Sequence, residues 1–545
     1  MLDKVLGVVE KVNSFINNLV WGWPMIILIL GTGILLTVRT KVMQVRKFGT
    51  SLNETIVPTI KSMGKKHAKS NGKENSISQF EAFATAISGT VGTGNIVGVT
   101  SAIMTGGPGA VFWMWISAFF GMITNYAENV LGLFFRKKEK NGDFSGGPAY
   151  YLSEGLAMNK KGKLGTFLKT LGKVLGIMAA VFCTFAAIGM SGVQTNKIST
   201  TFQEVVSGDK KIVGFVVGIA VAVVLALIIL GGIKSIGKVA AILVPFMSLL
   251  FILMALVVVF ANVTMVGTAF GLIFKNIFKI QSAVAGVGGY MIAEVVQKGF
   301  GRIIQKGLAR GVFSNEAGLG SSVIAHSASE TREPVKQGLW GIFEVFFDTF
   351  IICTLTALVV LVSFGDADGM KNVLYAEGAV DTTVSMMAFK EIFGMFGKIV
   401  YSTIIPLFAF TTILAWSYYG EKSVDFLFRK TGEKGRKIAT TVFKVTYVLL
   451  VIVSAIIDGE LAWAISDTFN GLMALPNLIG LVLMSGLVVK ITKNYFDRKN
   501  GKAVKPMLSA YDEQNEEFIG ELEGFDGEVV LTAEEASDEV KESEA

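Results

Sequence analysis

Residues 89–98 read Gly-Thr-Val-Gly-Thr-Gly-Asn-Ile-Val-Gly, and they interrupt an apolar segment, residues 80–104, that is long enough to cross a lipid bilayer. Four glycines in ten residues weaken a helix, because each costs about 1 kcal/mol relative to alanine in a helix interior. Main-chain groups freed by a break need polar partners, which only protein or a polar cavity supplies inside a membrane. The stretch therefore predicts a broken membrane helix whose loose ends bind ions and a small polar solute.

The composition indicates an integral membrane protein. The chain has 545 residues, of which 52% are hydrophobic and 17% charged, and long apolar runs recur from end to end. Cys183 and Cys353 both lie in apolar segments, so we expect no disulfide framework. We expect no nucleic-acid partner either, because the net charge of +7 is concentrated in a few connections between apolar runs.

Eleven membrane spans are predicted, and the charges between them predict an orientation. The spans are residues 20–39, 80–104, 108–135, 168–203, 211–233, 237–260, 298–326, 338–363, 397–419, 438–457 and 468–490. The connections on one side, 39–77, 136–173, 234–238, 326–337, 421–437 and 490–505, carry 34 Lys and Arg residues, against 9 on the other side. Since cytoplasmic loops are richer in Lys and Arg, we expect the N-terminus outside and the C-terminus in the cytoplasm, in the cell (plasma) membrane.

A second interruption, Phe313 to Ser322, reads Phe-Ser-Asn-Glu-Ala-Gly-Leu-Gly-Ser-Ser and again combines glycine with small polar residues. The two interruptions open two sets of five spans, residues 80–260 and 298–490. Because five is odd, the second set enters the membrane from the opposite face, which is the inverted repeat of many secondary transporters. The fold class is therefore all-α and membrane-embedded, with a 5+5 inverted repeat, an extra N-terminal helix, and a binding site between the two broken helices.

The remaining segments flank these two repeats. We expect an amphipathic segment at 1–19, an extra span with a basic cytoplasmic segment at 20–79, an extracellular linker at 261–297, and a disordered acidic tail at 491–545. A charged helical stripe approaches the second interruption and cannot face lipid, so it should line an aqueous vestibule or lie at the membrane interface. The stripe consists of Lys298, Arg302, Lys306 and Arg310.

Small and polar residues in three spans are candidates for the binding site. Thr90, Thr93 and Asn95 offer oxygen ligands for a hard cation, and freed N–H groups nearby attract a carboxylate. The alternative is plain small-residue helix packing. Gly189-Met190-Ser191-Gly192, followed by Gln194, provides a small-residue face and an amide for a substrate, unless Gln194 bonds another helix.

Two further groups of residues are candidates for the binding site, and each has a simpler structural explanation. Phe313 to Asn315 would line the site or act as a gate. Thr412 and Trp416 are four residues apart and share a helix face, so a hydroxyl for an ion and an indole for an apolar wall can converge there. Together with Thr411 they would otherwise serve core packing.

Ionisable residues inside predicted spans are functional hypotheses by default. Asp348 would be an ion ligand, a proton-coupling group or a hydrogen-bonded structural acid, and Glu128 and Glu316 are weighed in the same way. His326, at a helix end, is expected to be a hydrogen-bonded polar residue, and His67 to be solvated.

Enzyme signatures are absent from the sequence. It contains no His-Glu-x-x-His motif, no Gly-x-Ser-x-Gly elbow and no Walker lysine. Gly92, Gly94 and Gly98 are spaced as GxGxxxG inside a membrane span, which is not the dinucleotide fingerprint. Without a nucleotide site, uphill transport would draw on an ion gradient or on a partner subunit.

Four motifs in this order resemble the alanine or glycine:cation symporter family of prokaryotes. They are Gly-Thr-Val-Gly-Thr-Gly-Asn-Ile, Gly-Gly-Pro-Ala-Tyr-Tyr, Arg-Gly-Val-Phe-Ser-Asn-Glu-Ala-Gly-Leu-Gly-Ser and Thr-Thr-Ile-Leu-Ala-Trp-Ser-Tyr-Tyr-Gly-Glu, and the match covers about residues 15–495. The resemblance implies the leucine-transporter fold of the amino acid-polyamine-cation superfamily, with sodium-coupled uptake of alanine or glycine.

The resemblance also implies a set of site residues. Sodium would lie between backbone carbonyls near Gly89 and the hydroxyls of Thr411 and Thr412, by analogy with the wider fold. Met190 stands where we expect relatives to carry a branched aliphatic residue. The implied substrate site consists of Thr90, Gly94, Asn95, Gly189, Met190, Gln194, Phe313, Thr412 and Trp416.

The sequence thus predicts a sodium-driven symporter for a small neutral amino acid that works by alternating access in the lipid bilayer. The expected partners are the amino acid and Na⁺, with no obligate protein partner. The alternative is a proton-coupled transporter that uses Asp348 or Glu316. A channel would pass current beyond stoichiometric flux and a membrane-embedded enzyme would alter its solute, and neither class is favoured by the sequence.

Overall fold

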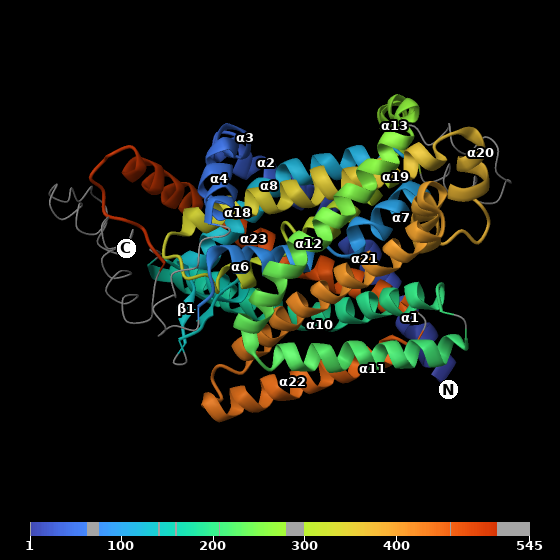
Figure 1. Ribbon diagram of the computed structural model, residues 1–545. Helices are drawn as coiled ribbons and strands as arrows, with labels where there is room; N and C mark the ends of the chain where they lie inside the picture. The colour runs from blue at the N-terminus through green and yellow to red at the C-terminus, as the bar shows by residue number, and fades with distance from the viewer. Residues whose placement is uncertain are drawn as a thin grey trace.

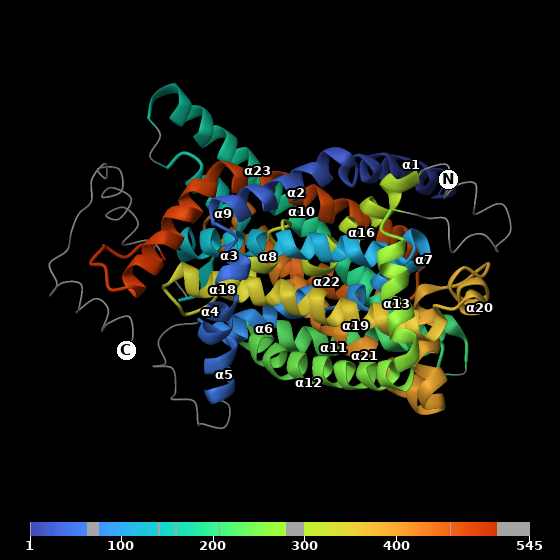
Figure 2. The same ribbon diagram turned by 90° about the horizontal axis from the view of Figure 1, so that it is seen from above.

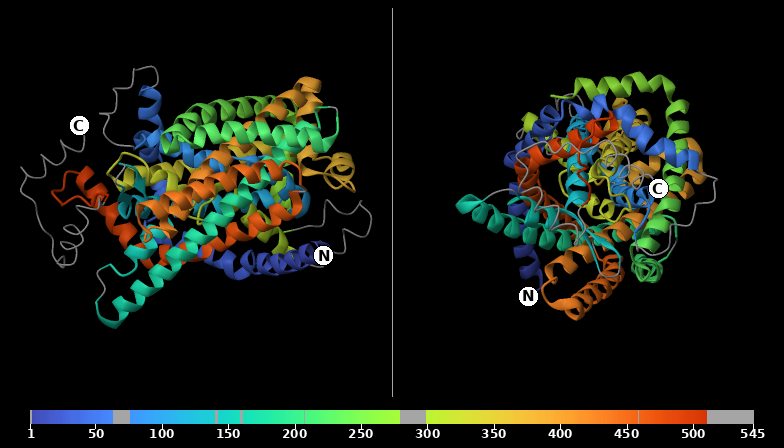
Figure 3. Two further views of the ribbon diagram at one scale, coloured as in Figure 1. Left: turned by 90° about the horizontal axis from the view of Figure 1, so that it is seen from below. Right: turned by 90° about the vertical axis from the view of Figure 1, so that its left-hand side faces the viewer.

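Long helices lie side by side along one direction and form a bundle, which is seen nearly end on in the right panel of Figure 3. The structure is a computed structural model that describes residues 2–62, 76–139, 142–158, 161–206, 208–278, 299–457 and 459–509. The side chain of Arg302 and all of His67, Lys298 and the acidic residues after 509 lie outside the described part.

The N-terminal half contains most of the shorter elements. They are α1 (Leu2–Val20), α2 (Trp23–Arg39), α3 (Met43–Arg46), α4 (Phe48–Glu54), α5 (Ile56–Ser62), α6 (Gln79–Thr90), η1 (Thr93–Asn95), α7 (Val97–Gly106), α8 (Ala110–Phe134), the antiparallel strands β1 (Lys137–Lys138) and β2 (Phe144–Ser145), α9 (Pro148–Gly155), α10 (Gly162–Gln203), α11 (Lys210–Ile229), α12 (Gly232–Ala261) and α13 (Val263–Lys275).

The C-terminal half contains the second broken segment and three long helices. Its elements are α16 (Gly299–Asn315), α17 (Ser322–His326), α18 (Pro334–Val345), the π-helix η2 (Phe346–Cys353), α19 (Thr354–Phe364), α20 (Ala367–Gly369), η3 (Met370–Leu374), α21 (Asp381–Leu427), α22 (Gly432–Ser454) and α23 (Gly459–Lys499).

The membrane spans agree with the prediction except at one place. Within the described residues, nine helices are long and apolar enough to cross a membrane, or ten when α6 and α7 count as one broken span. These ten coincide with ten of the predicted spans. The predicted span 298–326 corresponds to α16 and α17, which do not pass this test, so the count of eleven stays a prediction. The predicted linker 261–297 contains a helix, α13.

Both predicted interruptions are present. A capping box between Ser78 and Glu81 starts α6, which ends at Thr90, and the chain bends by 57° before it continues as α7. At the second interruption α16 runs as far as Asn315, and residues 316–321 are not helical before α17 begins. Three residues there, Glu316, Gly318 and Gly320, have positive φ angles, which end a right-handed helix.

Apolar side chains cover the outer face of the bundle as a bilayer requires. Ile212 and Leu227 on α11 and Phe246 on α12 are more than half exposed in the isolated chain. Inside, α8, α18 and α23 share one apolar cluster, and α10 and α21 share another. Exposed apolar surface of this extent belongs against lipid rather than water.

The bundle has two distinct ends (Figures 1 and 2). One end carries α4, β1 and the C-terminal segment, and the opposite end carries α20 and the N-terminus. The broken segments lie in the interior, where α16 contacts η1 and α7. This arrangement places the two interruptions beside each other between the two ends.

Candidate functional site

Gly92 lies at the first break and allows α21 to approach it closely. Its N–H donates to Asn95 Oδ1 at 2.9 Å, so the asparagine side chain satisfies a main-chain group that the break has freed. A Cβ at position 92 would lie 2.5 Å from Thr412 Oγ1. The Thr412 hydroxyl in turn donates to the carbonyl of Ser88, at 3.0 Å. Only glycine fits at this contact between the break and α21.

Glu316 lies at the second break and also contacts α21. Its φ of 54° is unusual for a residue other than glycine. Trp416 Nε1 donates to Glu316 Oε1 at 3.0 Å, and Ser321 Oγ donates to Oε2 at 2.5 Å. Because Thr412 and Trp416 are one helical turn apart, a single face of α21 contacts both breaks.

Asp348 joins the two breaks directly. This carboxyl group is fully buried in the π-helix η2, an irregularity often found at functional sites. Asn95 Nδ2 donates to its Oδ1 at 2.5 Å, and Ser314 Oγ donates to its Oδ2 at 2.9 Å. Thr349 Oγ1 also donates to Oδ2, at 2.8 Å. One carboxylate therefore holds a residue from each interrupted helix.

The α10 side of the site combines an amide with apolar side chains. Thr93 Oγ1 donates to Gln194 Oε1 at 2.8 Å, so Gln194 does bond another helix. Met190 belongs to one buried apolar cluster with Phe313 and Trp416. A Cβ on Gly94 would lie 3.6 Å from the ring of Phe313, which is ordinary contact. The two breaks, α10 and α21 thus enclose one small region.

Two predicted substrate residues do not point into this region. A Cβ on Gly189 would lie 2.9 Å from Ser466 Cα, so this glycine allows close packing of α10 against α23. Thr90 Oγ1 donates to the Ile87 carbonyl of its own helix, at 3.2 Å. The other predicted residues, which lie around the two breaks, are Gly94, Asn95, Met190, Gln194, Phe313, Thr412 and Trp416.

The residues predicted to bind sodium, on α6 and α21, contact different neighbours. Thr411 Oγ1 donates within its own helix and faces Met247 Sδ on α12, at 3.6 Å. Gly89 approaches Tyr419, whose hydroxyl would be 2.7 Å from a Cβ there. Among the described residues no group of three or more His, Cys, Asp or Glu side chains could hold a metal ion. The oxygen atoms near the breaks come from hydroxyl, amide and carbonyl groups and from Asp348, and oxygen ligands suit hard cations.

The partners of Ser314 and Glu316 are features that sequence reasoning missed. Ser314 was predicted within the candidate segment Phe313 to Asn315 and Glu316 as a possible proton-coupling acid, but neither the bond from Ser314 to Asp348 nor the bond between Glu316 and Trp416 was predicted. The available signal was the π-helix residue Asp348, a single carboxyl group in an apolar span that needed partners.

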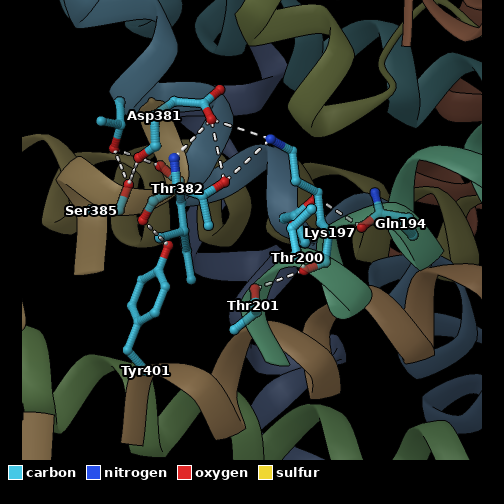
Figure 4. Close-up of polar contacts among 11 residues, drawn as sticks. Gln194, Lys197, Thr200, Thr201, Asp381, Thr382, Ser385 and Tyr401 are labelled. Carbon is cyan, nitrogen blue, oxygen red and sulfur yellow. Dashed lines mark hydrogen bonds and ion pairs between the residues drawn. The ribbon is translucent and has the colours of Figure 1, made fainter. Parts of the chain in front are cut away.

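A cavity of about 630 Å³ opens at the end of the bundle that carries α20. Lys197 Nζ lies 3.2 Å from Asp381 Oδ1 and 3.2 Å from Thr382 Oγ1, and it joins α10 to the start of α21 at the cavity wall (Figure 4). Gln194 lies one turn earlier on α10, so the cavity leads toward the site. Its lining includes Ser101, Thr105, Asn196, Lys197, Arg310, Asp381 and Trp463.

An aromatic stack separates this cavity from the two breaks. The rings of Phe313 and Trp463 stack with centroids 5.4 Å apart, and the Arg310 guanidinium lies 5.7 and 5.1 Å from the two centroids. Arg310 belongs to the charged stripe that was expected to line a vestibule, and for this residue the expectation is confirmed.

The opposite end of the bundle is closed by residues 327–331, which we call the 327–331 closure. The buried guanidinium of Arg136 donates to the carbonyls of Ser327, Ser329 and Thr331. Its Nε also donates to Ser509 Oγ at 2.7 Å. Ile77 pairs with the same segment through the Ala328 carbonyl and the Glu330 N–H. Burial and the nearby Glu81 raise the pKa of the Glu330 carboxyl group above its usual value.

Two interrupted helices that meet at a polar cluster, with an open cavity at one end and a closure at the other, define a secondary transporter. The crystal structure of MhsT in complex with L-phenylalanine matches this fold with a TM-score of 0.50 at 15% identity, over 77% of this chain and 99% of that chain. The likeness shows the leucine-transporter type of fold, whereas the number of spans and the repeat symmetry stay predictions.

The model of the sodium:alanine symporter family matches residues 6–509, and the chain belongs to this family. The sodium/alanine symporter AgcS of Methanococcus maripaludis is 41% identical over 90% of this chain and 98% of its own length. A Bacillus subtilis protein named "Probable sodium/glutamine symporter GlnT" is 33% identical over 90% of this chain and 92% of its own. The resemblance inferred from the four motifs is confirmed, and the chain is a transporter rather than an enzyme.

Proposed function

We propose that this chain imports a small neutral amino acid, alanine or glycine, together with Na⁺ across the plasma membrane. The end that carries α20 would face outward and the C-terminal end would face the cytoplasm, as the excess of Lys and Arg in the connections at that end favours. The observation that carries the proposal is Asp348, whose two carboxylate oxygens hold Asn95 of one break and Ser314 of the other.

Asp348 supplies the reason for a cation. A fully buried carboxylate costs several kcal/mol unless an opposite charge or good hydrogen bonds compensate it. The oxygens of Asp348 and Ser314, with carbonyls freed at the breaks, would coordinate one Na⁺. The Ser88 carbonyl and Thr412 hydroxyl beside Gly89 would serve a second ion, which keeps the expected site except for Thr411, whose hydroxyl faces α12.

The substrate would occupy the region that the breaks enclose. No acceptor among the described residues receives the N–H groups of Thr93 and Gly94, so both are available to the carboxylate of an amino acid. The ammonium group would meet carbonyl oxygens of the breaks. Met190, Phe313 and Trp416 limit the room for a side chain, which supports alanine or glycine over larger amino acids.

Binding of both solutes would couple transport to the sodium gradient. Each solute satisfies polar groups that the other leaves open, so the doubly loaded site is favoured over either singly loaded form. With both bound, the cavity end would close over the stack of Phe313 and Trp463 and the 327–331 closure would open.

Uptake of labelled alanine into proteoliposomes tests this proposal. An inward sodium gradient should drive accumulation, and collapse of the gradient should abolish it. Unlabelled glycine should compete, and glutamine should compete poorly. Uptake that ignores sodium, or equal competition by glutamine, would contradict the proposed coupling or the proposed substrate.

A proton-coupled carrier is the second candidate, because Asp348 and Glu316 are both buried carboxyl groups in contact with a break. Removal of sodium at constant pH distinguishes the two candidates. Uptake that persists and follows an imposed pH gradient would favour the proton.

A further inference from the structure

A fully buried polar cluster lies just after the second break and belongs to neither proposed binding region. His326 Nε2 of α17 lies 2.7 Å from Glu344 Oε2 of α18, and both side chains are completely inaccessible. Gln337 Nε2, two turns earlier on α18, lies 2.6 Å from His326 Nδ1. The imidazole is therefore held at both nitrogens by one face of α18.

This cluster contains acceptor oxygens that lack donors. Gln337 Oε1 and Asn129 Oδ1 are buried and receive no hydrogen bond within the described part of the chain. Glu344 Oε1 faces Ser322 and Asn125 without a hydrogen bond of standard geometry. A buried acceptor that lacks a donor needs an explanation, and a proton that is gained and lost would supply such a donor.

The charged and titratable surroundings are mostly acidic. Glu128 on α8, Glu316 at the second break, Asp348 on η2 and Tyr419 on α21 are close enough to interact electrostatically with Glu344. Within the described residues, no Lys or Arg forms an ion pair with His326 or Glu344. The Arg136 guanidinium bonds the carbonyl of Ser327, the residue after His326.

The buried cluster prefers to hold one proton more than the same side chains would hold in water. A neutral imidazole beside an ionised Glu344 leaves one uncompensated negative charge in a sealed interior, which is costly. One added proton gives an imidazolium and a carboxylate, with no net charge. If the Gln337 amide turns by 180°, its Oε1 accepts from the protonated Nδ1, and one orphaned oxygen gains its donor.

The location ties this proton to the 327–331 closure, which starts one residue after His326. We propose that His326 and Glu344 form a proton-binding site behind this closure, which holds one proton while the closure is shut and releases it to the cytoplasmic face when the closure opens. The assignment of that face rests on the orientation in the proposed function, whereas the proton site itself does not.

The sign of the pH effect follows from this difference in proton content. In water an imidazole is mostly neutral above about pH 6.5, so the opened cluster holds one proton fewer than the shut cluster there. Opening should therefore become more favourable as the pH at that face rises, by at most about tenfold per pH unit for one proton. Below about pH 6.5 both forms hold the proton, and the dependence should disappear.

Labelling of a cysteine in the closure measures its opening. Ser329 is buried in the closure, and Ser329→Cys would react with a charged maleimide only when the closure opens. The full-length chain with Ser329→Cys is compared with Ser329→Cys/Glu344→Gln, because the thiol chemistry is then the same in both. The ratio of labelling rates should rise severalfold between pH 6.5 and pH 8, and a ratio independent of pH would overturn the proposal.

Two controls separate this site from the transport activity. His67→Gln removes the other histidine of the sequence and should leave the labelling ratio unchanged.

In proteoliposomes, alanine uptake by the wild type should rise with internal pH at constant external pH, and Glu344→Gln should lose that dependence. Labelling that responds to pH without any sodium-dependent uptake would refute the proposed function alone, and uptake independent of internal pH would refute the proton site alone. Should Glu344→Gln fail to fold, the internal pH response of the wild type decides.

Discussion

Asp348 shows how one side chain can make two helix breaks depend on each other. An asparagine at this position would keep the volume, but it would lose the charge and replace one of the two acceptor oxygens with an NH2 donor. In the dry interior the charged form is stable only when donors and a cation surround it. The donors present, Asn95, Ser314 and Thr349, come from three elements, so loss of the charge would loosen all three contacts.

Asp348→Asn should weaken sodium activation of uptake by at least about tenfold, because a bond to a charged group contributes about 1.5–3 kcal/mol. The measurement is the sodium concentration for half-maximal alanine uptake in proteoliposomes. Glu391→Gln, which removes an exposed carboxylate, is the matched control and should behave like the wild type. An unchanged sodium dependence in Asp348→Asn would remove this carboxylate from the proposed ion site.

Asn95→Ala should abolish sodium-dependent alanine uptake without loss of protein from the membrane. The substitution removes both the acceptor for the Gly92 N–H and the donor to Asp348. Uptake and membrane abundance are measured on the same vesicles. Normal uptake by this variant would count strongly against the proposed site.

At the scale of elements, α21 is the helix that contacts both breaks. Thr412 lies against the first break and Trp416 against the second, one turn apart. The helix runs from Asp381 to Leu427, and the φ of 57° and ψ of −136° at Gly394 mark a kink in it. The part of α21 that faces the cavity is thus set at an angle to the part that faces the breaks.

Gly92→Ala should reduce uptake severely, because its Cβ would lie 2.5 Å from Thr412 Oγ1 and would push α21 away from the break. Gly98→Ala is the matched control on the same broken segment, since nothing lies within 4 Å of a Cβ there. The control should keep uptake and gain up to about 1 kcal/mol in stability. Uptake and thermal unfolding of both variants test this contrast, and similar losses in both would disprove it.

At the scale of the whole molecule, the two ends of the bundle differ in access. The end with α20 has an open cavity, whereas the 327–331 closure shuts the other end through contacts with Arg136 and Ile77. Arg136 also bonds Ser509 of the C-terminal segment. An ion pair adds a contact between α23 and the residue before α18, with Arg498 Nη2 2.6 Å from Glu333 Oε2. Among the described residues, the open cavity lies at one end and the closure at the other, as alternating access requires.

Arg136→Gln should destabilise the 327–331 closure. The substitution weakens charge-assisted bonds to three carbonyls, each contributing about 1.5–3 kcal/mol. Maleimide labelling of Ser329→Cys should then rise by at least about tenfold. Lys137→Gln removes a neighbouring cation. Its partly exposed ion pair with Glu154 contributes little to stability, so labelling of Ser329→Cys in this variant should stay low. Equal labelling in the two variants would mean that Arg136 does not hold the closure.

Much of the fold could be predicted because local composition reports it directly. Glycine and small polar residues at 89–98 and 313–322 weaken regular helix, and both interruptions are present in the structure. The stripe residue Arg310 was placed correctly, because a charge every fourth residue cannot face lipid. The span 298–326 was harder to define, since the same charges lower its hydropathy.

The positions of the two breaks could be predicted, but the contacts of the side chains around them could not. Residues of the breaks were identified from their own sequence, yet Gly189 packs against α23 and Thr411 faces α12. Which face of a helix meets a given neighbour depends on how all the helices pack, and no local pattern records that. The bond between Glu316 and Trp416 escaped prediction for the same reason.

Helix breaks, apolar spans and charged connections are local properties of the chain, because each depends on a few consecutive residues and their solvation. The meeting of Asn95 and Asp348 joins positions 253 residues apart, and it exists only because the packed bundle brings η1 against η2. The same holds for the His326–Glu344 pair, whose partners lie on opposite sides of a loop. Which charged groups are buried, and which residues they pair with, depends on how the helices pack. Packing therefore brings the two interrupted helices together in one candidate site.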